Sequence, residues 1–389
     1  MTTKAVEVHG RCDERFSPVR DAFTRNFDEF GDVGAAVAVT IDGKPVVDLW
    51  GGVSDKETMD PWQEDTLVTV YSTTKGMTAI CAHRLVEQGL LDLNAPVAKY
   101  WPEFAQAGKA DVPVHMLLSH RVGLPTVSDE LPEGAAFNWE TMTDALARQK
   151  PFWEPGTRHG YHGLTFGWLV GEVVRRVSGK SLGTFFRDEV AAPLGLDFHI
   201  GLDAKHDARI ATMYTAVVSV ETAREMEELQ QEVQGRMSPE LLSARGNISI
   251  QGAHNSEAWR RAEIPAANGH SDARSLARVY GALACGGRVD GVDVLSPEAI
   301  ATATIEQASG PDAMLTSSTR FAQGFWLSRD GNMGQNTRNF GHPGAGGSLG
   351  FADPDKHIGY GYVMNQMKVG LQNESTTSRR LIDALYSSL

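Results

Sequence analysis

The sequence predicts an α+β fold in which an antiparallel sheet flanked by helices is combined with an inserted, mostly helical region. Two observations carry this prediction. Segments with β character lie near both ends of the 389-residue chain, and the middle alternates helix-like runs with Pro and Gly breaks. A doubly wound protein would alternate strands and helices throughout. We therefore expect residues 1–80 and 285–389 to form one α/β domain around the sheet, and residues 81–284 to form a mostly helical domain.

The N-terminal part is predicted to supply a helix, a hairpin and a junction between a strand and a helix. Apolar residues at helical spacing between Phe16 and Phe27 indicate that residues 1–30 are helical. Two β-rich runs then flank Asp42-Gly43, a strong hairpin signal. The apolar run 66–71 leads into a second helical pattern, which Gly89 ends.

The middle and the end of the chain are assigned in the same way. The run LTFGWLVGEVVRRVSG (164–179) predicts a helix, and the polar segment 221–245 predicts a solvated helical excursion or flap. The segments FAQGFWL (321–327) and GSLGFADPDKHIGYGYVMN (347–365) predict strands, the second turning at Asp353-Pro354-Asp355. A short helix is expected over residues 374–388.

The charge balance argues against two classes of partner. The chain has 36 basic and 49 acidic residues and a net charge of −13 at pH 7. Nucleic acids and anionic membranes both require a basic face, so neither is an expected partner. The N-terminus has no apolar signal region, and no run of about 18 apolar residues occurs. These features predict a cytoplasmic protein without a membrane span, and they leave the oligomeric state open.

Two motifs that could indicate other chemistry do not fit their structural requirements, and the common metal-binding patterns do not occur. The segment GGSLG (346–350) matches G-x-S-x-G, but a nucleophile elbow needs a strand, a turn and then a helix, whereas here Ser348 is followed by a strand-like run. The segment GKS (179–181) lacks the opening glycine of a P-loop. The 12 histidines include no HExxH pattern and the 3 cysteines no CxxC spacing, so we expect neither a metal nor a cofactor.

The strongest catalytic signal is the S-x-x-K pattern formed by Ser72-Thr73-Thr74-Lys75. Ser72 stands where a strand-like run meets a helix, so Lys75 would lie one turn later on the same face. A nucleophilic serine activated by lysine requires an amine beside the hydroxyl, and a helix N-terminus favours an oxyanion. Burial would lower the pKa of Lys75 toward the value that a base needs. The alternative is an N-cap serine beside a surface lysine.

Two further segments favour catalysis. A turn-rich loop, FWEPGTRHGYHG (152–163), presents Tyr161 just before a helix, and a phenol near a Ser–Lys pair can relay a proton. The glycine-rich segment HPGAGG (342–347) leads into a strand. Backbone of this kind can approach a substrate carbonyl closely and donate an N–H group to it.

Taken together, these motifs resemble those of the serine β-lactamase-like superfamily, which has the class C β-lactamase and penicillin-binding-protein fold. They are most similar to the motifs of family VIII carboxylesterases. The resemblance rests on STTK at 72–75, on Tyr161 after a W-x-P-G-T loop, and on H-P-G at 342–344. The stretch LLSHRVGLP (117–125) fits the same branch, and the likeness spans residues 30–370.

The resemblance implies a β-lactamase/transpeptidase-like fold with the active site in the groove between the two domains. Ser72 would attack an acyl carbonyl, and Lys75 and Tyr161 would share its proton and later activate water. Which of the two is the base in acylation stays open, because coupled groups titrate together. The backbone N–H groups of Ser72 and Ala345 would bind the oxyanion. Substrate contacts are expected from His342, Gly344, Trp326 and Trp153, although both tryptophans could instead belong to the core.

Two departures from the family pattern point to esters. β-Lactamases and peptidases of this superfamily usually have Tyr-x-Asn and Lys-Thr-Gly, where this chain has Gly163 and His342. Both changes weaken recognition of anionic, peptide-like substrates and are compatible with neutral esters. We therefore predict a serine carboxylesterase that hydrolyses short-chain acyl esters of small molecules through an acyl-enzyme. The alternatives are an acyltransferase, or a β-lactamase, D-peptidase or amidase with the same site. A non-catalytic sensor would be expected to lack Ser72, Lys75 or Tyr161.

Overall fold

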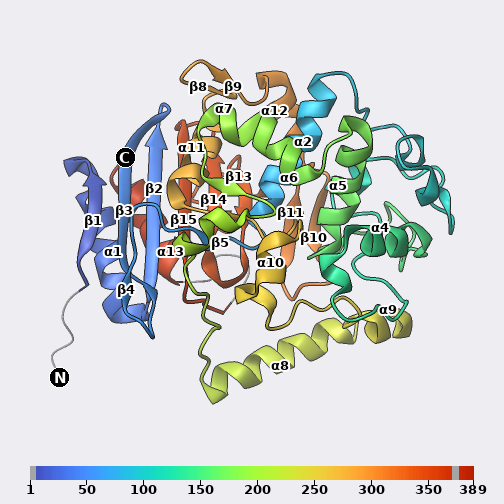
Figure 1. Ribbon diagram of the computed structural model, residues 1–389, viewed down its shortest axis with the longest axis horizontal. Coiled ribbons are helices and arrows are strands. Elements are labelled where there is room, and N and C mark those ends of the chain that lie inside the picture. The colour runs from blue at the N-terminus through green and yellow to red at the C-terminus, as the bar shows by residue number, and fades with distance from the viewer. Residues whose placement is uncertain (1–5, 370–375) are drawn as a thin grey trace.

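The computed structural model describes residues 6–369 and 376–389. Its main sheet is antiparallel throughout, with the strand order β1-β3-β2-β15-β14-β13-β12-β11-β10 and with β4 paired to β3 (Figure 1). The strands of this sheet are β1 (Val8–Cys12), β2 (Gly34–Ile41), β3 (Lys44–Asp55), β4 (Asp60–Pro61), β10 (Ala308–Pro311), β11 (Ser318–Phe321), β12 (Trp326–Leu327), β13 (Phe340–Pro343), β14 (Leu349–Asp353) and β15 (Ile358–Met364).

Two smaller sheets and the helices complete the fold. One small sheet has the order β5-β7-β6, and a two-stranded sheet joins β8 to β9. Their strands are β5 (Val68–Thr69), β6 (Phe198–His199), β7 (His270–Ser271), β8 (Arg288–Val289) and β9 (Val292–Asp293). The α-helices are α1 (Ser17–Phe30), α2 (Thr74–Glu87), α3 (His115–Leu118), α4 (Trp139–Arg148), α5 (Thr165–Ser178), α6 (Leu182–Phe186), α7 (Ala192–Leu194), α8 (Val220–Gln234), α9 (Pro239–Ala244), α10 (Glu257–Arg261), α11 (Ala273–Ala284), α12 (Pro297–Ala303) and α13 (Thr376–Ser387).

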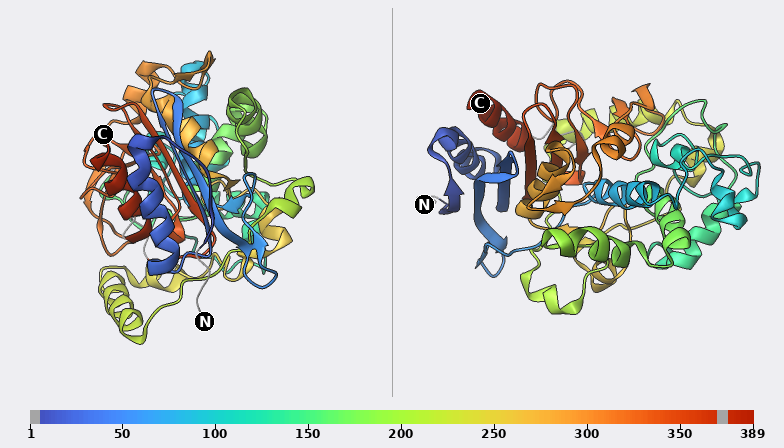
Figure 2. Two further views of the ribbon diagram at one scale, coloured as in Figure 1. Left: turned by 90° about the vertical axis from the view of Figure 1, so that its left-hand side faces the viewer. Right: turned by 90° about the horizontal axis from the view of Figure 1, so that it is seen from above.

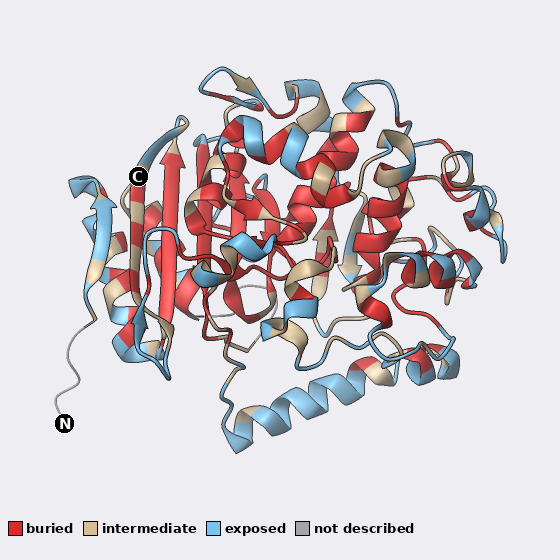
Figure 3. Ribbon diagram, in the orientation of Figure 1, coloured by how far each residue is buried: buried red, intermediate tan, exposed pale blue. Residues whose placement is uncertain are grey.

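The two ends of the chain meet in the middle of the main sheet. β2 pairs with β15 over seven residues, from Ala35 opposite Met364 to Ile41 opposite Ile358. Both strands are buried almost completely, as the red ribbons of Figure 3 show. Small and β-branched side chains suit this position, because a central strand is covered on both faces. The prediction that strands from both ends build one antiparallel sheet is confirmed.

Helices cover both faces of this sheet. Figure 2 shows α1 and α13 side by side on one face, while α11 packs against β15, β2 and β14 on the other. Glycine permits the close approach of α11. A Cβ atom at Gly361 would lie 2.2 Å from the carbonyl oxygen of Ala273, a distance that no side chain tolerates.

The helical region lies beside the sheet and is organised around α2. This helix packs against α5 and α6, and its residues from Thr74 to His83 are all buried. The predicted helix at 221–245 is present as α8 and α9; α8 runs along one side of the molecule, is mostly exposed and buries only Val233 (Figure 3). The domain division at residues 81 and 284 stays a prediction. It assigns α11 to the helical domain, although α11 packs on the sheet.

The sequence pattern predicted a helix over residues 1–30, but the N-terminal segment is only partly helical. Residues 8–12 form β1, which pairs antiparallel with β3, and α1 begins only at Ser17. The three central residues of β1 are exposed, so the strand has no apolar alternation that could reveal it. Its conformation depends on pairing with the edge of β3, which is a tertiary interaction.

The β structure predicted over residues 321–327 takes the form of a hairpin. β11 ends at Phe321, β12 begins at Trp326, and these two residues pair directly across a hairpin. The turn falls at Gln323-Gly324, where Gly324 has a φ of 96°, and a run of seven residues is too short for periodicity alone to separate a hairpin from one strand. The strands within 347–365 and the turn between them are present as β14 and β15. The predicted C-terminal helix is present as α13, and residues 374 and 375 lie outside the described part of the chain.

None of the helices in the described residues combines the length and the apolar character that crossing a lipid bilayer requires.

Candidate active site

Ser72 lies where β5 leads into α2. Tyr71, which precedes it, has a φ of 45°, a left-handed conformation that is uncommon for a residue other than glycine and often marks a functional site. The turn is held by Thr74, whose hydroxyl donates to the carbonyl of Tyr71 at 2.5 Å and accepts from the N–H of Gly269 at 2.9 Å. The small sheet that contains β5 thus positions the hydroxyl of Ser72 at the first turn of α2.

Lys75 is fully buried beside Ser72. Its Nζ lies 3.1 Å from Ser72 Oγ, 2.7 Å from the carbonyl oxygen of Gly163 and 2.8 Å from that of Ala266. Within residues 6–369 and 376–389, no carboxylate pairs with it. Burial lowers the pKa of Lys75 well below its ordinary value, because the charged form loses its hydration. A surface lysine beside an N-cap serine is therefore excluded, and a neutral amine can accept a proton from Ser72.

Tyr161 faces the same point from the segment before α5. Lys75 Nζ lies 4.8 Å from the centroid of the Tyr161 ring. The phenol is buried, and its hydroxyl makes no hydrogen bond within the part of the chain that the structure describes. Burial raises the pKa of Tyr161, and the nearby hydroxyl of Ser72 opposes part of this shift. The phenol is therefore protonated at neutral pH and is free to donate to a substrate or a water molecule.

Asp312 fixes the position of Tyr161. Its Oδ1 accepts from the backbone N–H of Tyr161 at 3.0 Å and from those of Met314 and Leu315 at 2.8 and 3.0 Å. Its Oδ2 accepts from the hydroxyl of Thr319 at 3.1 Å. Sequence analysis did not identify Asp312, because it is separated from Tyr161 by 151 residues and belongs to no motif.

The third motif packs glycine-rich backbone against the segment that carries Ser72. Residues 345–347 form a short 3₁₀ helix, η8, between β13 and β14. A Cβ atom at Gly344 would lie 2.1 Å from Ser348 Oγ, so only glycine allows this close packing. Among the described residues, neither the N–H of Ser72 nor that of Ala345 donates a hydrogen bond to another residue. Two unengaged donors of this kind are what an oxyanion hole needs.

His342 presents a lone pair rather than a positive charge. Its Nδ1 lies 2.7 Å from the carbonyl oxygen of Pro343, which can only accept, so Nδ1 carries the proton and Nε2 is an acceptor. Burial lowers the pKa of His342 well below its ordinary value, and the neighbouring Lys75 contributes to this shift. In the described structure, Nε2 of His342, Nε1 of Trp326 and Oη of Tyr161 all lack hydrogen-bond partners. Their rings lie within 6.0 Å of one another between centroids, so a polar group could bind among them.

The two tryptophans differ in their surroundings. Trp326 is fully buried against Tyr161 and His342. Trp153 is buried beneath the guanidinium of Arg158, and its Nε1 donates to the carbonyl of that residue at 3.1 Å. Substrate contact by either tryptophan stays a prediction.

A pocket of about 210 Å³ opens beside Tyr161. Its walls are mostly apolar, and it contains one charged side chain, that of Arg245. The lining residues are Pro125, Thr126, Tyr161, Gly163, Leu164, Arg245, Ile248, Met314 and Leu315. Sequence analysis did not single out Arg245, because it lies in a polar segment that carries no motif.

Ser348 of the G-x-S-x-G segment is placed differently from Ser72. It is buried between η8 and β14, and its hydroxyl donates to the carbonyl of Val70 at 2.8 Å. A strand rather than a helix follows it, so the geometry of a nucleophile elbow is absent. Ser348 serves to hold the backbone that leads into Ser72.

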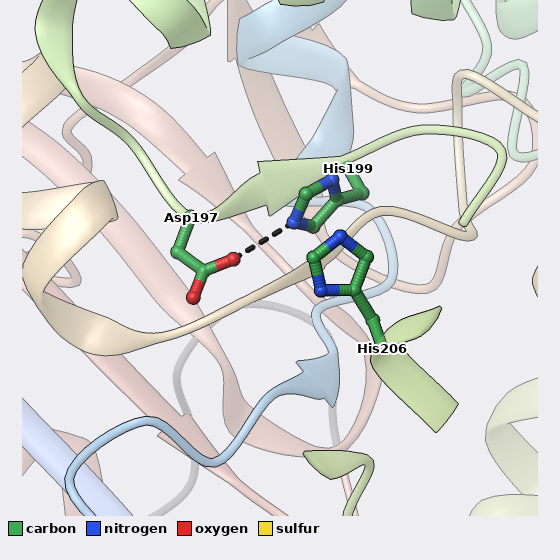
Figure 4. A group of neighbouring side chains, drawn as sticks. All are labelled: Asp197, His199 and His206. Carbon is green, nitrogen blue, oxygen red and sulfur yellow. Dashed lines mark hydrogen bonds and ion pairs between the residues drawn. The ribbon is translucent and has the colours of Figure 1, made fainter. Parts of the chain in front are cut away.

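One group of three side chains could in principle bind a metal ion within the described residues. Asp197, His199 and His206 place their ligand atoms within 4.8 Å of one another (Figure 4). However, His199 Nε2 lies 2.8 Å from one oxygen of Asp197, and Arg209 contacts both the other oxygen and Nδ1 of His206. A metal ion would have to displace a guanidinium cation, so these residues are better described as an ion-pair cluster. The absence of a metal or cofactor stays a prediction.

Comparisons with known proteins identify relatives over nearly the whole chain. The sequence model of a family described as Beta-lactamase matches residues 23–384. The chain is 36% identical over 370 residues to the Esterase/beta-lactamase LipL of Mycobacterium tuberculosis. That alignment covers 92% of this chain and 83% of the relative.

Solved structures show the same relationship. A family VIII carboxylesterase superposes with a TM-score of 0.90 at 42% identity, covering 98% of this chain and 100% of the other. A penicillin-binding protein homologue from Caulobacter crescentus superposes with a TM-score of 0.87 at 38% identity, with coverage of 98% and 100%.

Proposed function

The chain belongs to the beta-lactamase family and is a serine hydrolase, and from this premise we propose that it is a carboxylesterase for short-chain acyl esters. The fold is the β-lactamase/transpeptidase-like fold that the motifs predicted. The observation that carries the proposal is the contact of 3.1 Å between the buried amine of Lys75 and the hydroxyl of Ser72. The esterase names of two relatives support the choice of reaction. The predicted cytoplasmic location stays a prediction.

Acylation begins with attack of Ser72 Oγ on the ester carbonyl. The serine proton passes to the neutral amine of Lys75, and the carbonyl oxygen becomes an oxyanion that accepts from the N–H groups of Ser72 and Ala345. The C–O bond to the alcohol then breaks. The leaving alkoxide takes a proton through the hydroxyl of Tyr161, which Lys75 reprotonates. The products of this half are the free alcohol and an acyl ester on Ser72.

Deacylation repeats these steps with water as the nucleophile. One proton of the water passes through the hydroxyl of Tyr161 to the amine of Lys75, and the hydroxide adds to the acyl carbonyl. The bond to Ser72 Oγ then breaks, and the serine recovers its proton from Lys75. The unpartnered Nε2 of His342 is a suitable acceptor for the attacking water, because it lies beside Tyr161 and carries a lone pair.

Two features favour esters over β-lactams and peptides. Gly163 contributes a carbonyl to Lys75 and has no side-chain amide that could bind a substrate amide. His342 is neutral, so the third motif has no cation for a substrate carboxylate. An ester also requires less help at its leaving group than an amide, because an alkoxide is the weaker base.

The proposal is tested by hydrolysis of p-nitrophenyl butyrate by the wild type, Ser72→Ala and Ser348→Ala. We expect Ser72→Ala to lose activity by about 10³-fold or more, because the nucleophile is removed. Ser348→Ala should retain most of the activity, since it removes a structural hydrogen bond worth about 1 kcal/mol. Intact-mass spectrometry should detect a butyryl adduct on the wild type and none on Ser72→Ala.

The outcomes separate the candidates. If Ser72→Ala and Ser348→Ala lost esterase activity equally, Ser348 would again be a candidate for the nucleophile. An inactive wild type would contradict the esterase proposal, and amides, D-peptides and acyl transfer would then be assayed with the same variants.

A further inference from the structure

Arg245 stands out as a cation without a counter-charge. It follows α9 and lines the pocket beside Tyr161. Its guanidinium makes no hydrogen bond or ion pair with any residue in 6–369 or 376–389. Arg11, Arg25 and Arg224 also lack such partners in these ranges, but they are exposed, whereas Arg245 is half-buried.

The surroundings of Arg245 make a bound anion favourable. The pocket is otherwise lined by uncharged side chains such as Ile248, Leu164 and Leu315. A charge–charge interaction is stronger in a partly apolar pocket than in water, because the effective dielectric constant is lower. The molecule as a whole carries a net charge of −13. A cation without a neighbouring carboxylate therefore gives this pocket a charge opposite in sign to that of the whole molecule.

The position of the pocket indicates which part of an ester it would hold. Tyr161, which in the proposed function protonates the leaving alcohol, is one of its walls. Ser72 and Ala345, which would hold the acyl carbonyl, do not line it. The pocket therefore adjoins the leaving-group side of the scissile bond.

We propose that Arg245 is a specificity-determining residue that binds a negatively charged group, such as a carboxylate, on the alcohol portion of the substrate. The inference rests on the proposed function and narrows its substrate class to esters of hydroxy acids. This substrate class is anionic, whereas His342 considered alone indicates neutral esters. The cation that the third motif lacks is supplied instead by the segment that follows α9, whereas His342 belongs to β13. A planar guanidinium suits a carboxylate because it can donate two parallel hydrogen bonds.

The test compares two esters that differ only in charge: the butyrate ester of para-hydroxybenzoate, and that of para-hydroxybenzamide. Alkaline hydrolysis rates correct for their intrinsic reactivity. The wild type should prefer the carboxylate by about tenfold in kcat/KM. Arg245→Ala should abolish this preference, Arg245→Lys should keep part of it, and Arg245→Glu should reverse it in favour of the amide. A matched control is Arg236→Ala, an arginine outside the pocket that pairs with Glu232 and whose loss should leave both rates unchanged.

The failures can be told apart. If the wild type hydrolyses both esters without preferring the carboxylate, or if Arg245→Ala keeps the wild-type ratio, the inference is wrong and the esterase proposal stands. If the wild type hydrolyses neither ester, nor p-nitrophenyl butyrate, both are wrong. A second pair of substrates places the carboxylate on the acyl side, as in p-nitrophenyl hydrogen adipate against p-nitrophenyl hexanoate. An Arg245-dependent preference confined to that pair would overturn the assignment to the leaving group.

Discussion

Two residues of the candidate site owe their chemistry to burial rather than to their identity. Lys75 is enclosed by backbone carbonyls and the ring of Tyr161, and His342 by aromatic rings. Without counter-charges, burial disfavours the charged form of both groups and lowers the pKa of each well below its ordinary value. The site thereby obtains a neutral amine and a neutral imidazole, a base and an acceptor, from two residues that would both be cationic in acidic water.

The pH dependence of the reaction should follow the burial of Lys75. The amine must be unprotonated to accept the serine proton, so kcat/KM for p-nitrophenyl butyrate should rise with pH through the pKa of Lys75. Because burial lowers this pKa, the rise should lie well below the ordinary lysine value of 10.5. A pH–rate profile of the free enzyme measures it.

Lys75→Arg is the informative variant for this prediction. Arginine keeps the charge and the length but cannot be deprotonated, so we expect a loss of about 10²–10⁴-fold at every pH. A variant with near wild-type activity, or a wild-type profile that rises only near the ordinary lysine value, would contradict the role of Lys75 as a base.

At the scale of elements, α5 carries a buried ion-pair cluster behind the loop of Tyr161. Glu172 is fully buried and accepts from Trp139 Nε1 of α4, Arg175 and Arg176, each at 2.7 Å. Burial alone would raise the pKa of Glu172, but the hydrogen bonds from these three donors outweigh it, and its pKa is lowered. The carboxylate therefore ties α4 to α5 in its ionised form.

Glu172→Gln should cost about 2 kcal/mol of unfolding free energy at pH 7, less than a fully buried pair because both arginines reach solvent. The sign follows from the lowered pKa. The stabilisation by Glu172 is complete when the pH is above 4.5, the pKa of the carboxyl in the unfolded chain. It is lost as the pH falls through the lower pKa that Glu172 has in the folded protein. Urea unfolding at a series of pH values should show the gap between wild type and variant closing in acid.

The matched control for Glu172 is Glu225→Gln on the exposed α8, which should change stability by less than about 0.5 kcal/mol. The difference in unfolding free energy between the wild type and Glu172→Gln should therefore depend on pH. If it stayed constant from neutral pH into acid, the ionised carboxylate would not be its cause.

At the scale of the whole molecule, the fold is closed by its two ends. β2 and β15 are neighbours in the sheet although they lie more than 300 positions apart, and α13 packs against α1. Tyr386 of α13 donates to Asp353 at 2.6 Å, which connects the last helix to the end of β14. The C-terminal helix therefore supports β14, which follows η8 and pairs with β13, the strand that carries His342.

Leu385→Ala in α13 should destabilise the whole protein by about 2–5 kcal/mol, because Leu385 is fully buried and its truncation leaves a cavity. Thermal unfolding followed by circular dichroism should show one transition at lower temperature, with esterase activity lost in the same transition. Asp383→Ala, an exposed position in the same helix, should shift the midpoint little. Retention of activity after the main unfolding transition of Leu385→Ala would show that the site does not depend on the closed fold.

Much of this protein can be predicted from local sequence patterns. The hairpin at Asp42-Gly43, the helix after Ser72 and the helix that ends at Gly179 all depend on periodicity and turn residues that lie close together in the chain. The motifs at Ser72, Tyr161 and His342 likewise indicate the family, because each is a short run whose residue types and order are specific. For the same reason the α+β class was correct before any contact was known.

Other features depend on contacts between distant segments. The edge strand β1 and the hairpin at residues 321–327 are set by pairing across the sheet; β1 has no apolar alternation, and Gly324 alone marks the turn of the hairpin. Asp312 and Arg245 reach the site from segments without motifs, since a hydrogen bond to a backbone N–H or an unpaired cation in a pocket requires no particular neighbours in sequence. The lowered pKa of Lys75 was decided in the same way, because desolvation is produced by everything that packs around a side chain and not by the residues beside it in the chain.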